Sequence, residues 1–108
     1  MIETNNAKNI TDFEDKSLLI VDDDNPFRER LARAMEKKGF MVTQAEGVKK
    51  GITSVNDKKP AFAVIDLRLN DGNGLEVVKE IQKVNPDSRI IMLTGYGNIP
   101  TAVAAIKH

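Results

Sequence analysis

Four aspartates in this sequence are placed where they could bind a divalent cation. Asp22, Asp23 and Asp24 directly follow the apolar run LLIV, and Asp66 directly follows the apolar run AVI. If the two runs form neighbouring strands, these carboxylates lie close together. Two carboxylates about 5 Å apart repel each other by roughly 3 kcal/mol at an effective dielectric constant of about 20, so the group requires a proton or a cation. Mg²⁺ is the natural choice, because it prefers oxygen ligands and takes one or two protein carboxylates together with phosphate oxygens and waters.

An ordinary structural role is the alternative for these aspartates. Aspartate is common at the ends of strands and at the N-termini of helices. Asn25 can supply the N-cap of the helix that follows, however, so three consecutive acids exceed that need. Asp66 alone could be a turn residue, but two acidic segments that each follow a buried strand favour the cation site.

Thr94 could add a hydroxyl group to the same site. It ends the fourth apolar run and precedes the sequence GYG, so its hydroxyl could donate to a phosphoryl oxygen while the glycine beside it leaves space for an incoming donor. A β-branched residue is also favoured in strands for its shape alone, and its position does not separate the two roles. Gly72 and Gly74 allow positive φ angles in the loop after Asp66, and a generic turn explains them as well as a functional role does.

Short apolar runs that alternate with helical patterns must position these residues. Strands are predicted at residues 17–21, 41–45, 61–66 and 89–93, and the first, third and fourth are apolar enough to be parallel strands covered on both faces. The first intervening helix is predicted to open with Asn25 as N-cap and Pro26 in its first turn and to stop at Gly39, and the third to end before Pro86. The residues predicted to face inward are Phe27, Leu31, Ala34 and Met35 in the first helix; Val48, Ile52 and Val55 in the second; Leu75, Val78, Ile81 and Val84 in the third; and Val103 and Ile106 in a fourth that begins near Pro100.

This order of elements predicts the α/β class. Right-handed crossovers and short connections leave a flavodoxin-like, doubly wound parallel sheet as the simplest topology. In such a sheet ligands bind outside the carboxyl ends of the strands, where the strand order reverses. The acidic segments and Thr94 are predicted at those ends.

The composition excludes several other kinds of protein. The 108 residues, 41% of them hydrophobic, predict one compact domain at residues 17–108 after a polar, flexible arm at residues 1–16. Sixteen basic residues balance sixteen acidic ones, so there is no net positive field to hold nucleic acid. The sequence has no cysteine and no apolar run long enough for a signal peptide or a membrane span, and we expect a cytoplasmic protein without membrane contact.

Three motifs resemble those of response regulator receiver domains of two-component systems. They are LIVDDD, which contains Asp23; VIDLRL, which contains Asp66 and is followed by Gly72 and Gly74; and MLTGYG, which contains Thr94. The resemblance covers residues 17–108, and the segments LARAMEK, DGNGL and TGYGNI are closest to the RegA/PrrA/ActR subgroup of redox-responsive global regulators. It implies a CheY-like sheet of strand order 2-1-3-4, from which the family's fifth strand and fifth helix are missing.

The resemblance also implies a role for each candidate residue. Asp66 would accept a phosphoryl group from the phosphohistidine of a sensor histidine kinase. Asp23 would bind Mg²⁺ directly beside Asp66, Asp22 would act through water, and the backbone carbonyl of Arg68 would complete the protein ligands. Thr94 would then move toward the phosphoryl group as the switch hydroxyl. The domain would be a regulatory switch in transcription and not an enzyme, apart from phosphotransfer onto Asp66 and its slow reversal by hydrolysis.

Two features of the family are not found in the sequence. The first is the lysine at the end of the fifth strand. Lys107 cannot take that role, because it belongs to the predicted fourth helix. The second is the helix-turn-helix output domain of the subgroup. We therefore expect a receiver domain truncated before its fifth strand, with DNA contact only through a missing C-terminal domain. The sheet edge exposed in this way predicts a homodimer or a swapped oligomer.

Two other functions remain open on the sequence alone. A receiver-like interaction module that works without phosphorylation is compatible with the missing lysine. A Mg²⁺-dependent aspartyl phosphohydrolase is suggested by the Asp-x-Asp pattern of Asp22 to Asp24, although such enzymes continue with an apolar residue and a threonine where this sequence has Asn25 and Pro26.

Overall fold

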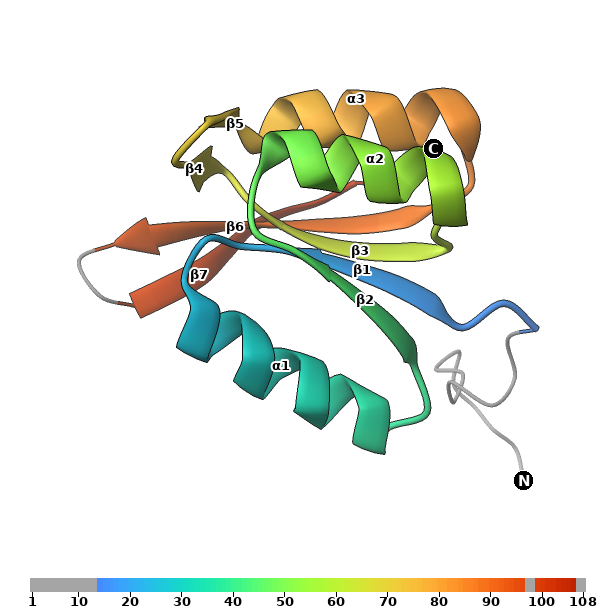
Figure 1. Cartoon of the computed structure of the whole chain (residues 1–108), viewed down its shortest axis with the longest axis horizontal. Helices are drawn as coiled ribbons and strands as arrows, with labels where there is room; N and C mark the ends of the chain where they lie inside the picture. The colour runs from blue at the N-terminus through green and yellow to red at the C-terminus, as the bar shows by residue number, and fades with distance from the viewer. Residues whose placement is uncertain (1–13, 97–98, 107–108) are drawn as a thin grey trace.

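The computed structural model describes residues 14–96 and 99–106. A sheet with strand order β2-β1-β3-β6-β7 is covered by α1 on one face and by α2 and α3 on the other (Figure 1). Its strands are β1 (Ser17–Val21), β2 (Met41–Ala45), β3 (Phe62–Asp66), β6 (Arg89–Tyr96) and β7 (Ile99–Ile106), and its helices are α1 (Asn25–Lys37), α2 (Val48–Lys58) and α3 (Gly74–Val84).

The parallel part of the sheet confirms the predicted topology. β1 pairs in parallel with both β2 and β3, and β3 pairs in parallel with β6, which is the fourth predicted strand. The order 2-1-3-4 of the doubly wound fold is therefore confirmed. Two predicted strands have the observed bounds, whereas β3 begins one residue later than expected and β6 continues to Tyr96.

Alternation along β1 explains why this strand is apolar on both faces. Leu19 and Val21 belong to the core beneath α2 and α3, and Leu18 and Ile20 belong to a second core beneath α1. Successive side chains of a strand point to opposite faces, so a strand covered on both sides needs an apolar residue at every position. The central strands are thereby fixed between the two helical layers.

The helices bury somewhat different residues from those predicted. Leu75 is 43% exposed, and Val77, which the prediction omitted, is fully buried. In α1 the buried alanine is Ala32, whereas Ala34 is exposed. The observed stripe of α3, at Gly74, Val77, Val78 and Ile81, follows the spacing i, i+3, i+4, i+7, which defines one helix face better than the predicted set does.

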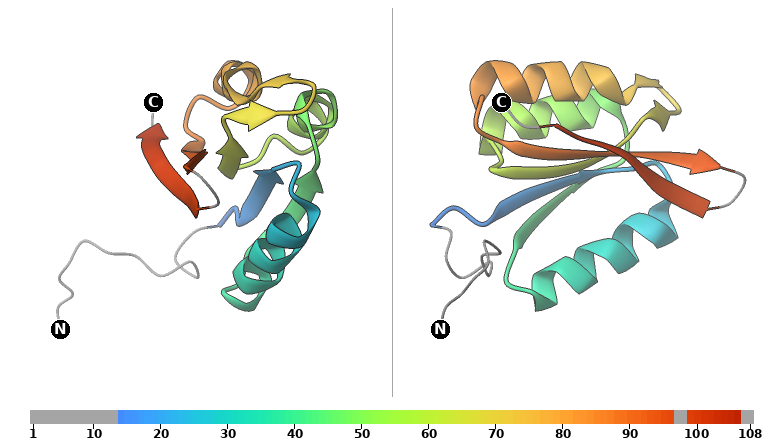
Figure 2. Two further views of the ribbon diagram at one scale, coloured as in Figure 1. Left: turned by 90° about the vertical axis from the view of Figure 1, so that its left-hand side faces the viewer. Right: turned by 180° about the vertical axis from the view of Figure 1, so that it is seen from behind.

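The predicted fourth helix is wrong, because residues 99–106 form strand β7. β7 pairs antiparallel with β6, with Thr94 opposite Thr101 and Gly95 opposite Pro100 (Figure 2). The outer edge of β6 carries main-chain N–H and C=O groups that require partners, and a segment with threonine, valine and isoleucine can supply them as a strand. The edge that was expected to be open, and on which the predicted oligomer depended, is therefore covered by β7.

The arm predicted at residues 1–16 lies mostly outside the described residues. Its last residues are tied to the sheet: the Asp15 carboxylate accepts hydrogen bonds from the backbone N–H and the hydroxyl of Ser17, at 3.0 and 2.6 Å. The carbonyl of Lys16 accepts one from the N–H of Met41 at 2.9 Å. Among the described residues, no helix is long and apolar enough to cross a bilayer.

Candidate functional site

Three of the four predicted aspartates meet at the carboxyl end of the sheet. Asp22 and Asp23 follow β1, and Asp66 ends β3, which lies beside β1. One carboxylate oxygen from each of the three lies within 4.8 Å of the others. We call these residues the aspartate cluster; the doubly wound topology brings them together from two segments that are far apart in the sequence.

The loop between β1 and α1 holds the first part of the cluster. The N–H of Asp22 donates to the carbonyl of Ala45 at the end of β2, at 3.1 Å, and one carboxylate oxygen of Asp22 accepts from the N–H of Asp24 at 2.8 Å. Asp24 in turn caps α1 by accepting from the N–H of Phe27 at 3.1 Å. The predicted N-cap, Asn25, is wrong: Asp24 is the cap, and it is the one aspartate of the run that an ordinary structural role explains.

The loop after β3 holds Asp66. The N–H of Arg68 donates to an Asp66 carboxylate oxygen at 3.3 Å. A two-stranded hairpin, β4 (Arg68–Leu69) and β5 (Gly72–Asn73), then leads into α3. Gly72 has the predicted positive φ, 151°. Because the backbone N–H of Arg68 binds the carboxylate, the hairpin limits how far the Asp66 side chain can turn.

Gly74 is required for close packing rather than for the predicted positive φ. It opens α3, and a Cβ atom built at this position would collide with the carbonyl oxygen of Asp66 and with a methyl group of Ile65. The absence of a side chain therefore lets the start of α3 approach the end of β3. This contact sets the position of α3 relative to Asp66.

Burial and mutual repulsion make the ionised cluster unfavourable. Burial raises the pKa of Asp22 to about 6, with further increases from the charges of Asp66, Asp23 and Asp24 and an opposing hydrogen bond from the Asp24 N–H. Burial also raises the pKa of Asp66, and the charge of Asp23 adds to this while the N–H of Arg68 opposes it. A divalent cation would relieve both the burial of negative charge and the repulsion.

The donor set fits a hard divalent cation. All three groups offer carboxylate oxygens, Asp22 is only 6% exposed, and Asp23 and Asp66 are partly open to solvent. Mg²⁺ retains several waters and accepts few protein ligands, so a half-open group of this kind suits it. Such a group can hold a divalent cation at the rim of the sheet and leave some of its coordination positions open to other oxygen ligands.

Thr94 lies on the strand beside Asp66, but it does not end that strand as predicted. Leu93 is level with Asp66 in the pairing of β3 with β6, and Thr94 is the next residue. The carbonyl of Leu93 accepts a hydrogen bond from the N–H of Leu67 at 2.8 Å, which ties β6 to the loop after Asp66. The partly buried Thr94 side chain is therefore one residue beyond the level of the cluster.

Two residues near the cluster were missed by reasoning from the sequence. Arg28 is buried and binds the loop between β1 and α1, and Asp71 accepts hydrogen bonds from the N–H groups of Val48 and Lys49 at the start of α2, at 2.7 and 3.1 Å. A signal for Arg28 was available, because a basic residue near the N-terminus of a helix opposes the helix dipole. No local signal links Asp71 to α2, since the two are distant in the sequence.

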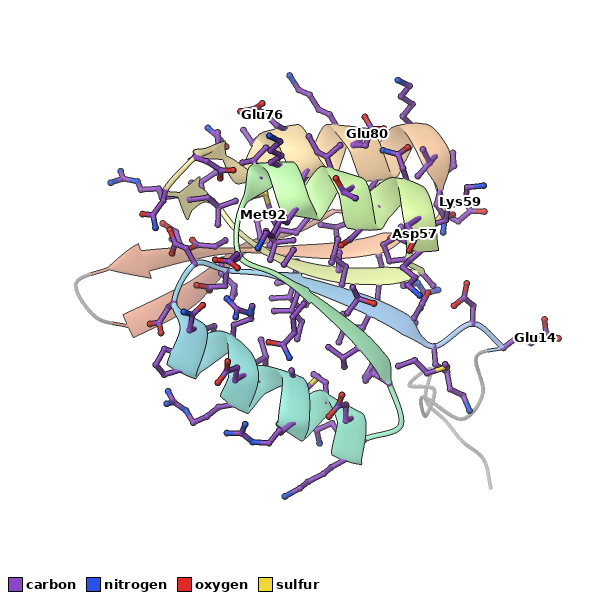
Figure 3. The ribbon with its side chains drawn as sticks, in the orientation of Figure 1. Glu14, Asp57, Lys59, Glu76, Glu80 and Met92 are labelled. Atoms are coloured by element: carbon purple, nitrogen blue, oxygen red, sulfur yellow. The ribbon has the colours of Figure 1, made fainter. Side chains whose placement is uncertain are left out.

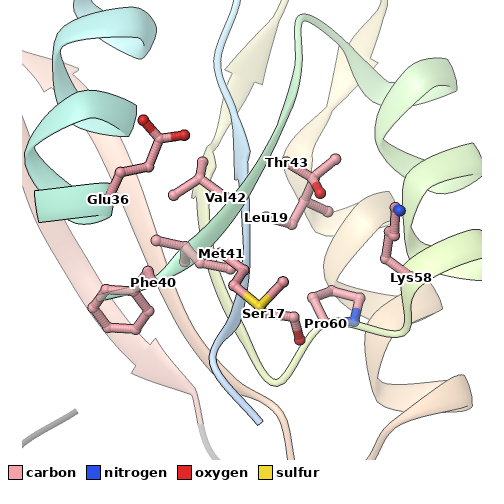
Figure 4. Close-up of a pocket in the computed structure, with 10 residues that line it drawn as sticks. Ser17, Leu19, Glu36, Phe40, Met41, Val42, Thr43, Lys58 and Pro60 are labelled. Carbon is pink, nitrogen blue, oxygen red and sulfur yellow. The ribbon is translucent and has the colours of Figure 1, made fainter. Parts of the chain in front are cut away.

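A groove at the amino end of the sheet is a poor candidate for the same chemistry. It has a volume of about 390 Å³ and lies between the ends of α1 and α2 (Figure 4). Its walls are mainly apolar, with Glu36 and Lys58 as its charged residues. Ser17 and Met41 are the first residues of β1 and β2, and Pro60 lies two residues before β3. The groove is therefore at the opposite end of the sheet from the aspartate cluster.

Comparison with known families agrees with this geometry. The family model described as the response regulator receiver domain matches residues 18–108. The chain belongs to the response regulator receiver domain family. Receiver domains are regulatory modules rather than conventional enzymes, and the matched range includes the segments that contain Asp23, Asp66 and Thr94.

The predicted subgroup is confirmed by curated relatives. The receiver domain is 61% identical to the photosynthetic apparatus regulatory protein RegA of Rhodobacter capsulatus, over 86% of this chain and 50% of the relative. It is 59% identical to the acid tolerance regulatory protein ActR of Rhizobium meliloti (strain 1021), over 86% of this chain and 48% of the relative. The chain thus spans about half the length of the curated relatives it matches.

A solved structure shows the same fold. A response regulator protein from Burkholderia pseudomallei, with a phosphorylated aspartic acid, a calcium ion and citrate, is 35% identical and superposes with a TM-score of 0.72. The match covers 77% of this chain and 49% of that one. The CheY-like arrangement of the receiver domain is therefore confirmed.

Proposed function

We propose that this receiver domain accepts a phosphoryl group on Asp66 while Mg²⁺ is bound by the aspartate cluster. The observation that carries the proposal is the convergence of the Asp22, Asp23 and Asp66 carboxylates within 4.8 Å at the carboxyl end of the sheet. The relative from Burkholderia pseudomallei contains both a phosphorylated aspartic acid and a divalent cation, which supports the same use of the cluster here.

Four residues supply the proposed protein ligands. Asp23 and Asp66 would bind Mg²⁺ directly, Asp22 would bind through water, and the carbonyl of Arg68 would complete the set. When bound, the cation would neutralise charge on the phosphoryl oxygens. The hydrogen bond from the N–H of Arg68 to an Asp66 carboxylate oxygen supports the inclusion of Arg68, because it brings that residue next to the proposed acceptor.

The proposed reaction needs little covalent machinery from the protein. A carboxylate oxygen of Asp66 attacks phosphorus, the N–P bond of the donor phosphohistidine breaks, and the released imidazole nitrogen takes up a proton. The product is an acyl phosphate, and attack by water later releases inorganic phosphate and restores Asp66. Thr94, one residue beyond the level of Asp66 on β6, would donate its hydroxyl to a phosphoryl oxygen and pass the change to the surface.

The proposed partners follow from the kind of domain. A sensor histidine kinase would supply the phosphoryl group, and a cytoplasmic location would make the kinase accessible. The curated relatives are regulatory proteins about twice the length of the matched segment, which supports a receiver domain that controls a transcriptional output domain. DNA contact would belong to that output domain.

The test is phosphorylation by acetyl phosphate, followed by intact-mass measurement. We expect the wild-type chain to gain the mass of one phosphoryl group with Mg²⁺ and to gain none after chelation. Asp66→Asn should gain none. Asp57→Asn is the matched control, because Asp57 is an exposed aspartate at the far end of α2 (Figure 3), and it should behave as wild type.

Two results would contradict the proposal. Equal gain of mass by the wild type and Asp66→Asn would place the phosphoryl group elsewhere. No gain by either chain, together with no binding of beryllofluoride in the presence of Mg²⁺, would instead favour an interaction module that works without phosphorylation.

A further inference from the structure

Arg28 is a buried cation that the proposed reaction does not use. It lies near the N-terminus of α1 and is 8% exposed. Its Nη1 atom donates to the backbone carbonyl of Asp22 at 2.8 Å and to the side-chain oxygen of Asn25 at 2.7 Å. Its Nε atom donates to the side-chain oxygen of Gln44 on β2, at 3.0 Å.

These acceptors do not neutralise the charge of Arg28. Its three hydrogen bonds go to neutral oxygens, and its Nη2 atom lies 4.0 Å from a carboxylate oxygen of the largely exposed Glu29. Burying a guanidinium group without a closely paired carboxylate is costly. The charge of Arg28 also helps, after Lys50, to lower the pKa of the exposed Glu46.

The hydrogen bond to Asp22 acts on the peptide unit that joins the first two members of the cluster. The carbonyl of Asp22 and the N–H of Asp23 belong to one rigid plane. Holding this carbonyl fixes the orientation of the plane, so that rotation about the N–Cα bond of Asp23 is the remaining backbone freedom that sets where its side chain points. The bond to Gln44 extends this restraint to β2, whose last residue, Ala45, binds the N–H of Asp22.

We infer that Arg28 is a positioning residue for the divalent cation site. The guanidinium group holds the Asp22–Asp23 peptide so that the Asp23 carboxylate faces Asp66 before the cation arrives. This inference rests on the proposed function, because it concerns the affinity of the cluster for Mg²⁺. Groups that orient metal ligands in this way typically alter metal affinity by about 10- to 100-fold when they are removed.

The experiment measures the Mg²⁺ dissociation constant by isothermal titration calorimetry. Arg28→Met keeps much of the side-chain volume and removes the charge and all donors; we expect its Kd to rise by about 10- to 100-fold. Arg28→Lys keeps the charge but lacks the fork that binds two neighbours at once, so its Kd should rise by a smaller factor. Arg33→Met is the matched control, because Arg33 is an exposed arginine of the same helix, and its Kd should be close to that of wild type.

A second measurement separates positioning from a purely structural role of Arg28. Hydrogen exchange in the metal-free chain should accelerate in Arg28→Met at the amide of Asp24, which binds the Asp22 carboxylate, and remain slow at the amides of α3. Circular dichroism checks the fold of each variant. If Arg28→Met does not fold, Arg28→Lys carries the test, with a weaker Kd in a folded chain as the expected result.

The outcomes distinguish this inference from the proposed function. If the wild-type chain binds Mg²⁺ and folded Arg28→Met or Arg28→Lys binds it with the same Kd, the positioning role is overturned and the proposed function stands. No Mg²⁺ binding by the wild-type chain would overturn both. A weaker Kd with rapid exchange throughout α1, β1 and α3 would indicate general loosening and would also overturn the inference.

Discussion

The two ends of the parallel sheet are built from different interactions. At the amino end, the rings of Phe40 and Phe62 pack edge to face with centroids 5.2 Å apart, beside an apolar groove. At the carboxyl end, three carboxylates converge and the loops are held by hydrogen bonds from Arg28 and to Asp71. Apolar contacts therefore stabilise the strands at one end, while the other end gathers carboxylates whose burial and mutual repulsion oppose folding.

Truncation at the amino end should separate stability from cation binding. Phe62→Ala removes the edge-to-face contact and leaves a cavity beneath α1, so we expect a loss of about 3 kcal/mol in the free energy of unfolding, measured by urea denaturation. The Mg²⁺ affinity of the folded molecules should not change. Phe62→Leu retains most of the apolar volume and should lose less. A large change in Mg²⁺ affinity in either variant would show that the two ends are coupled.

Removal of a charge at the carboxyl end should stabilise the metal-free chain. The pKa of Asp22 is raised from its usual value of 3.8 to about 6, so the folded chain holds the proton more tightly than the unfolded chain does. The wild type therefore loses stability as the pH rises from about 4 through 6, whereas Asp22→Asn does not. At pH 7 we expect the variant to be more stable by about 1 kcal/mol, after allowance for partial solvent screening.

Denaturation at several pH values, with a chelator present, tests this expectation. Saturating Mg²⁺ should reverse the order at pH 7, because only the wild type retains the full cluster. Equal stability of the two metal-free chains at pH 4 and at pH 7 would show that the carboxyl end carries no such cost.

Loss of the Asp71 cap should have the smallest of the three effects. Asp71→Ala removes the acceptor for the N–H groups of Val48 and Lys49, and Gly47 offers no side chain to replace it. We expect the thermal midpoint to fall by a few degrees at neutral pH. Those same N–H groups lower the pKa of Asp71, so the stabilisation is present above the usual aspartate range and is lost as the pH falls below it.

Thermal unfolding of Asp71→Ala and Asp71→Asn at neutral and acidic pH provides the measurement. Asp71→Asn keeps one acceptor oxygen and should lie between Asp71→Ala and wild type. The same difference between variant and wild type at every pH would mean that the charge of Asp71 is irrelevant to the cap.

The sequence predicted the parallel strands because their physical signal is local. Four consecutive apolar residues in β1, from Leu18 to Val21, require cover on both faces, and the aspartates that follow β1 and end β3 then fall at one end of the sheet. The side-chain contacts of Arg28 with Gln44 and of Asp71 with α2 could not be predicted in the same way. They join segments from different elements, and nothing in either segment alone specifies its partner.

The segment at residues 99–106 shows where periodicity fails. Val103 and Ile106 have the spacing of a helix face, but the same residues are compatible with a strand. The open edge of β6 decides between the two, because main-chain hydrogen bonds become available there. The N-cap of α1 was assigned to Asn25 for a similar reason: asparagine and aspartate are equally good caps, and only the structure shows that Asp24 accepts from Phe27.

The separation of β1 and β3 along the chain links occupancy of the aspartate cluster to complete folding. A helix, a strand and a second helix lie between the two halves of the cluster, so no short fragment can assemble it. A cation that binds only the assembled cluster would stabilise the native state by about 2.7 kcal/mol at a concentration one hundred times its dissociation constant. The cellular concentration of that ion would then govern how long the chain survives proteolysis, independently of any signal that it transmits.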